Sequence, residues 1–172
     1  MNYFELYELP VSFSVDEIQL KKKYLELSKK YHPDFFVNET EEKQNEILQL
    51  ATRNTNAFNT LSDFDKRMKY VLELKNILHE GENYELPKEF LFDMMEVNEE
   101  LMELESENNE TKIKNFNSKI SSLQESFLSE VKPVLENKAE NSSADLLRVK
   151  EYFFKRKYLL RIQERINKFA AS

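Results

Sequence analysis

Apolar residues recur at helical spacing along the whole chain, and polar residues fill the positions between them. The clearest stripe is spaced by steps of four and three residues and consists of Phe90, Met94, Val97, Leu101 and Leu104. At about 100° per residue, these side chains fall within about 40° of one line along a helix. We therefore expect this stripe to lie in the core of a helical domain.

Capping residues and breakers divide the pattern into helices. Ser14 followed three residues later by Glu17 has the form of a capping box, which predicts that a helix begins there. Pro33 breaks this helix, so we expect it to end at about Tyr31. A second apolar pattern over 40–61 predicts a helix of similar length. These two helices could pair as a hairpin.

A shorter helix is expected next, from the N-cap signal at Asp63 to about Leu78. The following segment contains Gly81, the only glycine, and ends at Pro87, which suits the first turn of a helix. We place the domain boundary in this segment. Three more helices are expected over 87–108, 110–137 and 142–170. The predicted fold is all-α, with a domain over 1–78, a linker over 79–86 and a three-helix bundle over 87–172.

Charge is unevenly distributed in the predicted bundle. Positions 85–110 hold ten acidic residues and one lysine, whereas positions 145–168 hold eight basic and three acidic residues. Because helices of opposite charge attract each other, we expect these two segments to pack antiparallel.

Composition excludes several classes of protein. The single glycine argues against P-loop, Rossmann and most all-β architectures, and the absence of cysteine excludes disulfides and thiolate metal sites. No apolar run exceeds three residues, and the start lacks the pattern of a signal peptide, so we expect a cytoplasmic protein without membrane association. A net charge of -7 makes nucleic acid an unsuitable partner.

A histidine, a proline and an aspartate follow one another after the first long helix, as His32, Pro33 and Asp34. Proline disfavours a helical backbone at the residue before it, so the loop presents an imidazole and a carboxylate in a defined turn. Lysines seven residues apart share one stripe of the preceding helix and would attract an acidic partner surface. These lysines are Lys22, Lys29, Lys23 and Lys30.

The first part of the chain resembles a J-domain. The resemblance rests on residues 2–10, the run from Tyr31 to Asp34, and residues 57–63 followed by Lys66, Arg67 and Tyr70. It implies an antiparallel helical hairpin whose basic face, with Lys22, Lys23, Lys29 and Lys30, meets a DnaK-type ATPase chaperone. It also assigns His32, Pro33 and Asp34 to triggering ATP hydrolysis in that partner.

The helix over 87–108 has a second feature besides its core stripe. Leu91, Met95 and Met102 widen the stripe on one flank, and Phe92 lies about 200° from its line, among acidic residues. Apolar side chains inside a charged rim are typical of a docking surface.

The whole layout resembles the HscB family, the J-proteins of iron–sulfur cluster assembly, because a J-domain precedes a three-helix bundle. Residues 90–103 resemble that family's scaffold-binding motif, although Phe92 is bulkier than the expected aliphatic residue. The resemblance also implies an aromatic contact from the last helix, which we place at Phe154, with Phe153 equally compatible. The implied scaffold contacts are Leu91, Phe92, Met95, Glu96, Glu99, Glu103 and Phe154.

We therefore expect a co-chaperone, not an enzyme, that binds an IscU-like scaffold and delivers it to a DnaK/HscA-type chaperone. The alternative is a J-protein for another client, with the bundle as a spacer or dimerisation element. An enzymatic di-metal site would need Glu-x-x-His pairs, which the sequence lacks, and His79 is expected at the surface of the linker. We expect no cofactor and no metal site.

Overall fold

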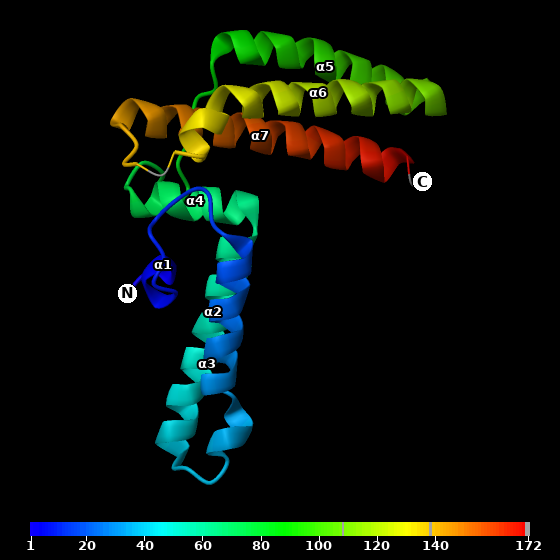
Figure 1. Ribbon diagram of the computed structural model, residues 1–172. Helices are drawn as coiled ribbons and strands as arrows, with labels where there is room; N and C mark the ends of the chain where they lie inside the picture. The colour runs from blue at the N-terminus through cyan, green and yellow to red at the C-terminus, as the bar shows by residue number, and fades with distance from the viewer. Residues whose placement is uncertain (108, 138, 171–172) are drawn as a thin grey trace. The chain divides into compact units, whose positions relative to one another are not determined.

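The computed structural model describes residues 1–107, 109–137 and 139–170, and all regular structure in these residues is helical (Figure 1). The predicted all-α class is confirmed. The chain divides into two compact units, Met1–Lys75 and Asn76–Ser172, called here the first and the second unit. The elements are α1 (Tyr3–Leu6), α2 (Glu17–Lys30), the 3-10 helix η1 (Pro33–Phe36), α3 (Glu41–Ser62), α4 (Phe64–Leu74), α5 (Lys88–Glu107), α6 (Glu110–Leu135) and α7 (Ser143–Ala170).

An antiparallel hairpin of α2 and α3 forms the main part of the first unit (Figure 1). Tyr24 of α2 stacks on Phe58 of α3 with ring centroids 4.3 Å apart. The Asn54 side chain donates hydrogen bonds to the Tyr24 carbonyl and to Ser28, which lie on the opposite helix. The expected hairpin is therefore present, and η1 lies in the connection between its two helices.

Two helix boundaries differ from expectation. Asp16, not Ser14, caps α2, because its carboxylate accepts hydrogen bonds from the backbone N–H groups of Ile18 and Gln19. The α4 helix ends at Leu74, short of residue 78, and Asn76 follows with a φ of 56°, a left-handed conformation that does not continue a helix.

The short α1 helix was not predicted. Asn2 and Glu5 form a reciprocal capping box at its start, and this box is the local signal that could have revealed it. Phe4 of α1 is fully buried in the first unit.

The second unit is a bundle of α5, α6 and α7. Its core contains the whole stripe predicted on α5, with each of the five side chains at most 3% exposed. The acidic and basic segments pair as expected, since the Arg165 guanidinium donates two hydrogen bonds of 2.6 Å to the Glu105 carboxylate.

The expected antiparallel packing of these two charged segments was wrong. Asn98 of α5 bonds Tyr158 of α7, and Glu105 pairs with Arg165, so residue numbers increase in the same direction along both helices. Two turns separate α5 from α7, and each turn reverses the chain, so the first and third helices run parallel (Figure 1). The antiparallel neighbour of both is α6.

Among the described residues, no helix is both long enough and apolar enough to cross a membrane.

Candidate functional site

A hydrogen bond within the loop itself orders the turn that carries His32, Pro33 and Asp34. α2 ends at Lys30, and His32 takes the N-cap position of η1. The His32 Nδ1 accepts a hydrogen bond of 3.3 Å from the Asp34 N–H, which leaves the ring proton on Nε2. Both side chains are exposed, by 53% for His32 and 83% for Asp34, and the His32 Nδ1 lies 3.7 Å from an Asp34 carboxylate oxygen. The loop thus offers a donor and a carboxylate side by side to a partner.

A shallow groove of about 290 Å³ lies beside this loop. Phe35, which the sequence did not single out, lines this groove; it is 74% exposed, and its ring centre lies 5.6 Å from that of His32. Leu25 of α2 is 47% exposed and also lines the groove. The lining residues are Leu25, Ser28, Lys29, His32, Asp34 and Phe35.

The four predicted lysines are not equivalent. Lys22, Lys29 and Lys30 are exposed, and Lys30 lies over the ring of Tyr31. Lys23 forms an ion pair with Glu8, which the sequence analysis did not single out. This hydrogen-bonded pair raises the pKa of Lys23 and lowers that of Glu8. Three of the four predicted cations therefore face solvent, and the fourth is occupied within the first unit.

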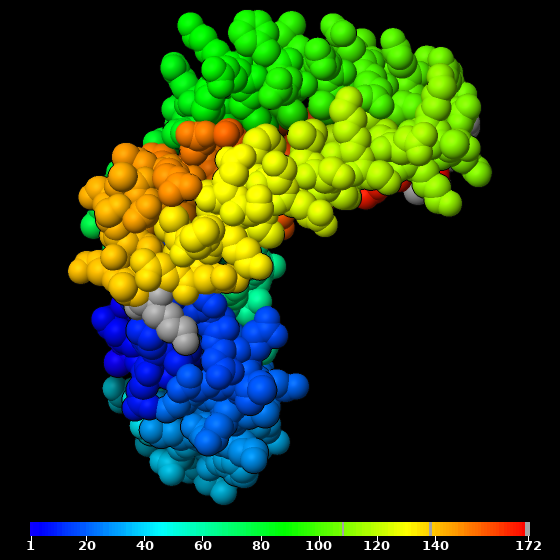
Figure 2. Space-filling model, turned by 45° about the horizontal axis from the view of Figure 1, so that its top comes forward, coloured from blue at the N-terminus to red at the C-terminus, as the bar shows by residue number. Residues whose placement is uncertain are grey.

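The outer face of α5 exposes apolar side chains. Phe92 is 67% exposed, Met95 57% and Leu91 40%, although Phe90 and Met94 beside them are buried. Figure 2 shows the side chains of α5, in green, standing out from the bundle. The flank that the sequence added to the core stripe therefore lies at the surface, within an acidic rim. The exposed acidic residues of this rim that were predicted as contacts are Glu96, Glu99 and Glu103.

Phe154 has a neighbour that the sequence did not reveal. Its ring stacks on that of Tyr84, with centroids 4.5 Å apart and planes at 6°, and it meets the edge of the Phe153 ring at 5.2 Å. All three rings are half-buried, so exposure does not separate Phe153 from Phe154. The only available signal for Tyr84 was that it is the single aromatic residue of the linker over 79–86.

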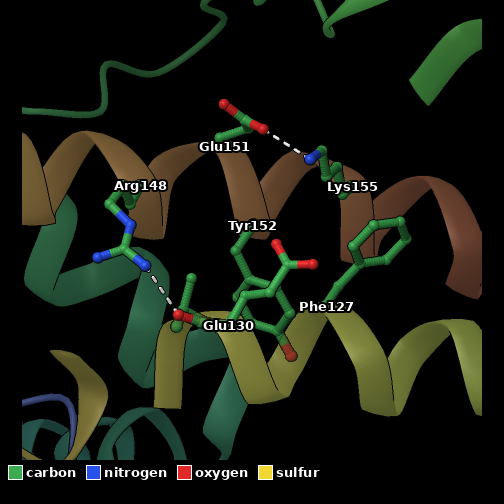
Figure 3. A pocket seen from close by; sticks show the side chains of 7 residues that line it. Phe127, Glu130, Arg148, Glu151, Tyr152 and Lys155 are labelled. Carbon is green, nitrogen blue, oxygen red and sulfur yellow. Dashed lines mark hydrogen bonds and ion pairs between the residues drawn. The ribbon is translucent and has the colours of Figure 1, made fainter. Parts of the chain in front are cut away.

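A small notch of about 80 Å³ lies between α6 and α7 (Figure 3). Its basic side chains are already engaged, because Lys155 pairs with Glu151 at 2.6 Å and Arg148 donates to the Glu130 carbonyl at 2.9 Å. In the part of the chain that the structure describes, no cluster of three or more His, Cys, Asp or Glu side chains has an arrangement that could hold a metal ion.

Comparison with known proteins matches both parts of the chain. A family model described as the DnaJ domain matches residues 2–70, and one described as the HSCB C-terminal oligomerisation domain matches residues 86–167.

Relatives with curated names match along most of their length. A "Co-chaperone protein HscB homolog" of Vibrio cholerae is 31% identical over 159 residues, which are 91% of this chain and 93% of that protein. The "Iron-sulfur cluster co-chaperone protein HscB" of Homo sapiens is 31% identical over 166 residues, 96% of this chain and 67% of that protein.

Solved structures resemble the present fold as a whole. The structure of the chaperone HscB from Vibrio cholerae matches with a TM-score of 0.75 at 27% identity, and the match covers 98% of this chain and 96% of the Vibrio chain. The crystal structure of human co-chaperone protein HscB matches with a TM-score of 0.79 at 30% identity, and the match covers 97% of this chain and 81% of the human one.

Proposed function

This chain belongs to the HscB family of J-domain co-chaperones, and from that premise we propose that it brings an IscU-like iron–sulfur scaffold to a DnaK/HscA-type chaperone and stimulates the ATPase of that chaperone. The second unit binds the scaffold in this proposal, and the first unit engages the chaperone.

The observation that carries the proposal is the division of α5 into two faces. Phe90 and Met94 are at most 3% exposed in the core, whereas Phe92 and Met95 are more than half exposed on the same helix. Exposing large apolar side chains to water is unfavourable, and a cluster of them inside an acidic rim is what a protein partner covers. A partner patch that fits this face is apolar and bordered by basic side chains.

The first unit supplies the second contact. Lys22, Lys29 and Lys30 steer an acidic chaperone surface towards α2, because opposite charges accelerate association. His32 then donates from Nε2, and the Asp34 carboxylate competes for a cation of the chaperone. ATP hydrolysis takes place in the chaperone in this proposal, and this chain acts on it through contact alone.

A single-turnover assay of the chaperone ATPase tests both contacts. We expect the wild-type protein to stimulate hydrolysis, the scaffold to increase the stimulation synergistically, and Asp34→Asn to abolish it. Stimulation that is the same with and without the scaffold would indicate that the bundle binds another client. No stimulation by wild type with the cognate chaperone would contradict the assignment of the loop.

Self-association is a second candidate role for the α5 face. The family model that matches residues 86–167 is described as an oligomerisation domain. Sedimentation equilibrium of the chain alone distinguishes the two roles. A dimer that Phe92→Ala converts to a monomer would favour self-association, whereas a monomer that forms a one-to-one complex with the scaffold would favour client binding.

A further inference from the structure

The segment between α4 and α5 is fastened to α7 by one largely buried lysine. Lys150 is 8% exposed, and its ammonium donates a hydrogen bond of 2.8 Å to the Ile77 carbonyl and forms an ion pair with Glu82. A buried charge is costly unless it is paired and hydrogen-bonded, so these contacts hold the segment in one place. The same ammonium lies 5.7 Å from the centre of the Tyr84 ring.

Tyr84 is thereby placed on a predicted contact residue. The Tyr84 ring has two neighbours: the Lys150 ammonium, and the stacked ring of Phe154, whose centroid is 4.5 Å away. Stacking covers one face of the Phe154 ring. A client that reaches Phe154 from this side therefore meets Tyr84 first.

The aromatic pair lies at the same level of the bundle as the exposed residues of α5. Asn98 pairs with Tyr158 and Glu105 with Arg165, so α5 and α7 run in a constant parallel register. Phe154 precedes Tyr158 by one helical turn, about 5.4 Å along the axis. This places the ring at the level where Leu91 and Met95 leave α5, and not at the far end of the bundle.

We propose that Tyr84 is a further scaffold-contacting residue, which extends the predicted contact at Phe154 onto the linker segment. The inference rests on the proposed function, because its partner is the same IscU-like scaffold. Aromatic rings supply much of the binding energy at protein interfaces, and a ring that is already held in place loses little conformational freedom on binding. Because the surface formed by the rings is apolar, the scaffold contributes an apolar side chain at this point.

The phenol hydroxyl of Tyr84 offers the scaffold a second, polar contact. The hydroxyl carries its proton at neutral pH, as tyrosine ordinarily does, and partial burial, followed by the nearby Glu151 and Glu82 carboxylates, raises the pKa of Tyr84 further. Comparing the removal of the ring with the removal of the hydroxyl alone separates the two contributions.

Titration calorimetry of the full chain with the IscU-type scaffold tests the proposal. We expect Tyr84→Ala to weaken binding roughly tenfold, as for a truncated aromatic in an interface, and Tyr84→Phe to stay within about threefold of wild type. Unchanged scaffold-free ATPase stimulation and an unchanged melting temperature show that the variants remain folded. Unchanged or tighter binding by Tyr84→Ala would overturn the proposal, because Tyr84 would then be neutral or would merely cover Phe154.

A fluorescent reporter gives an independent readout. The chain contains no tryptophan, so Tyr84→Trp introduces a single tryptophan on the ring stack, whose emission can be excited separately from that of the tyrosines. With a scaffold that lacks tryptophan, we expect the emission to shift on complex formation, and no shift would contradict contact at this position. Different results would reject the Tyr84 contact and the proposed scaffold binding. If Leu91→Ala loses binding while Tyr84→Ala keeps it, only the Tyr84 contact is rejected. If the wild-type chain does not bind the scaffold, both are rejected.

Discussion

The Tyr7 hydroxyl donates a hydrogen bond of 2.8 Å to the side-chain oxygen of Asn54, and both residues are buried in the first unit. Asn54 donates in turn to the Tyr24 carbonyl and to Ser28. This network connects the segment after α1 with both helices of the hairpin, so it fixes the support on which the His32 loop is built.

Asn54→Ala is expected to destabilise the protein by about 2–4 kcal/mol, because it removes the side-chain hydrogen bonds to Tyr7, to the Tyr24 carbonyl and to Ser28 and opens a cavity. The Tyr7 hydroxyl keeps the Asn54 carbonyl as an acceptor. Urea denaturation followed by circular dichroism measures the change. The exposed Asn56→Ala on the same helix is the matched control, with an expected change within about 0.5 kcal/mol. Equal losses in the two variants would contradict a structural role for the network.

Removing one exposed lysine is expected to slow chaperone association. Lys29→Met should reduce the association rate about threefold at low ionic strength, and the difference should shrink as salt is added. Stopped-flow mixing at several salt concentrations measures both effects.

The Lys23 ion pair provides the control for this prediction. A double variant, Glu8→Gln with Lys23→Met, removes the pair without changing the net charge. We expect its association rate to equal that of wild type. A loss as large as that of Lys29→Met would show that Lys23 leaves Glu8 to contact the chaperone.

Simultaneous replacement of Leu91, Phe92 and Met95 by alanine is expected to weaken scaffold binding by roughly 100-fold, since these side chains form the exposed centre of the proposed interface. Titration calorimetry measures the affinity. Ile18→Ala, which truncates an 84% exposed side chain in the first unit, is expected to leave scaffold binding unchanged. A similar loss in both would indicate non-specific apolar contact.

Met94→Ala should show the opposite behaviour. Met94 is 1% exposed in the core of the bundle, so its truncation is expected to destabilise the second unit by about 2–4 kcal/mol. At temperatures where the variant is folded, we expect the scaffold affinity to remain near that of wild type. Thermal denaturation and calorimetry on the same sample test this, and a stable variant with lost affinity would place Met94 in the interface.

Acidification is expected to release the linker segment. The hydrogen bond from Lys150 holds the pKa of Glu82 below its usual value, so the pair stabilises the folded state above that usual value. The stabilisation is lost as pH falls through the lowered pKa, because protonation removes the charge from Glu82. The difference in stability between wild type and Glu82→Gln should therefore be constant near about pH 7 and decrease below about pH 4.

The exposed Glu80→Gln is the control for this pH series, and its stability should match that of wild type throughout. Denaturation midpoints measured across the series test the prediction. A difference between wild type and Glu82→Gln that does not change with pH would reject the proposed role of the Glu82 charge.

Local features of the fold were predictable from the sequence. The α5 stripe, the cap at Asp63 and the break at Pro33 depend on residues within one or two helical turns, and the structure contains all three. The motif of His32, Pro33 and Asp34 was likewise legible, because three consecutive residues carry it. The cap of α2 was misplaced because Ser14 and Asp16 are both good capping residues, and backbone geometry selects between them.

The sequence alone thus determined an all-α chain with two helical parts, the buried stripe of α5 and the loop after α2, because helical periodicity and capping act over a few residues. The tertiary structure decided that Leu91 and Met95 are exposed, that α5 and α7 are parallel, that Glu8 occupies Lys23, and that Tyr84 covers Phe154. Each of these depends on whether a distant segment of the chain packs against the residue and which side chain it brings; Glu8 and Lys23, for example, are 15 residues apart in the sequence. Burial and pairing are properties of the packed chain, and a periodic pattern identifies the faces of a helix without specifying what packs against them.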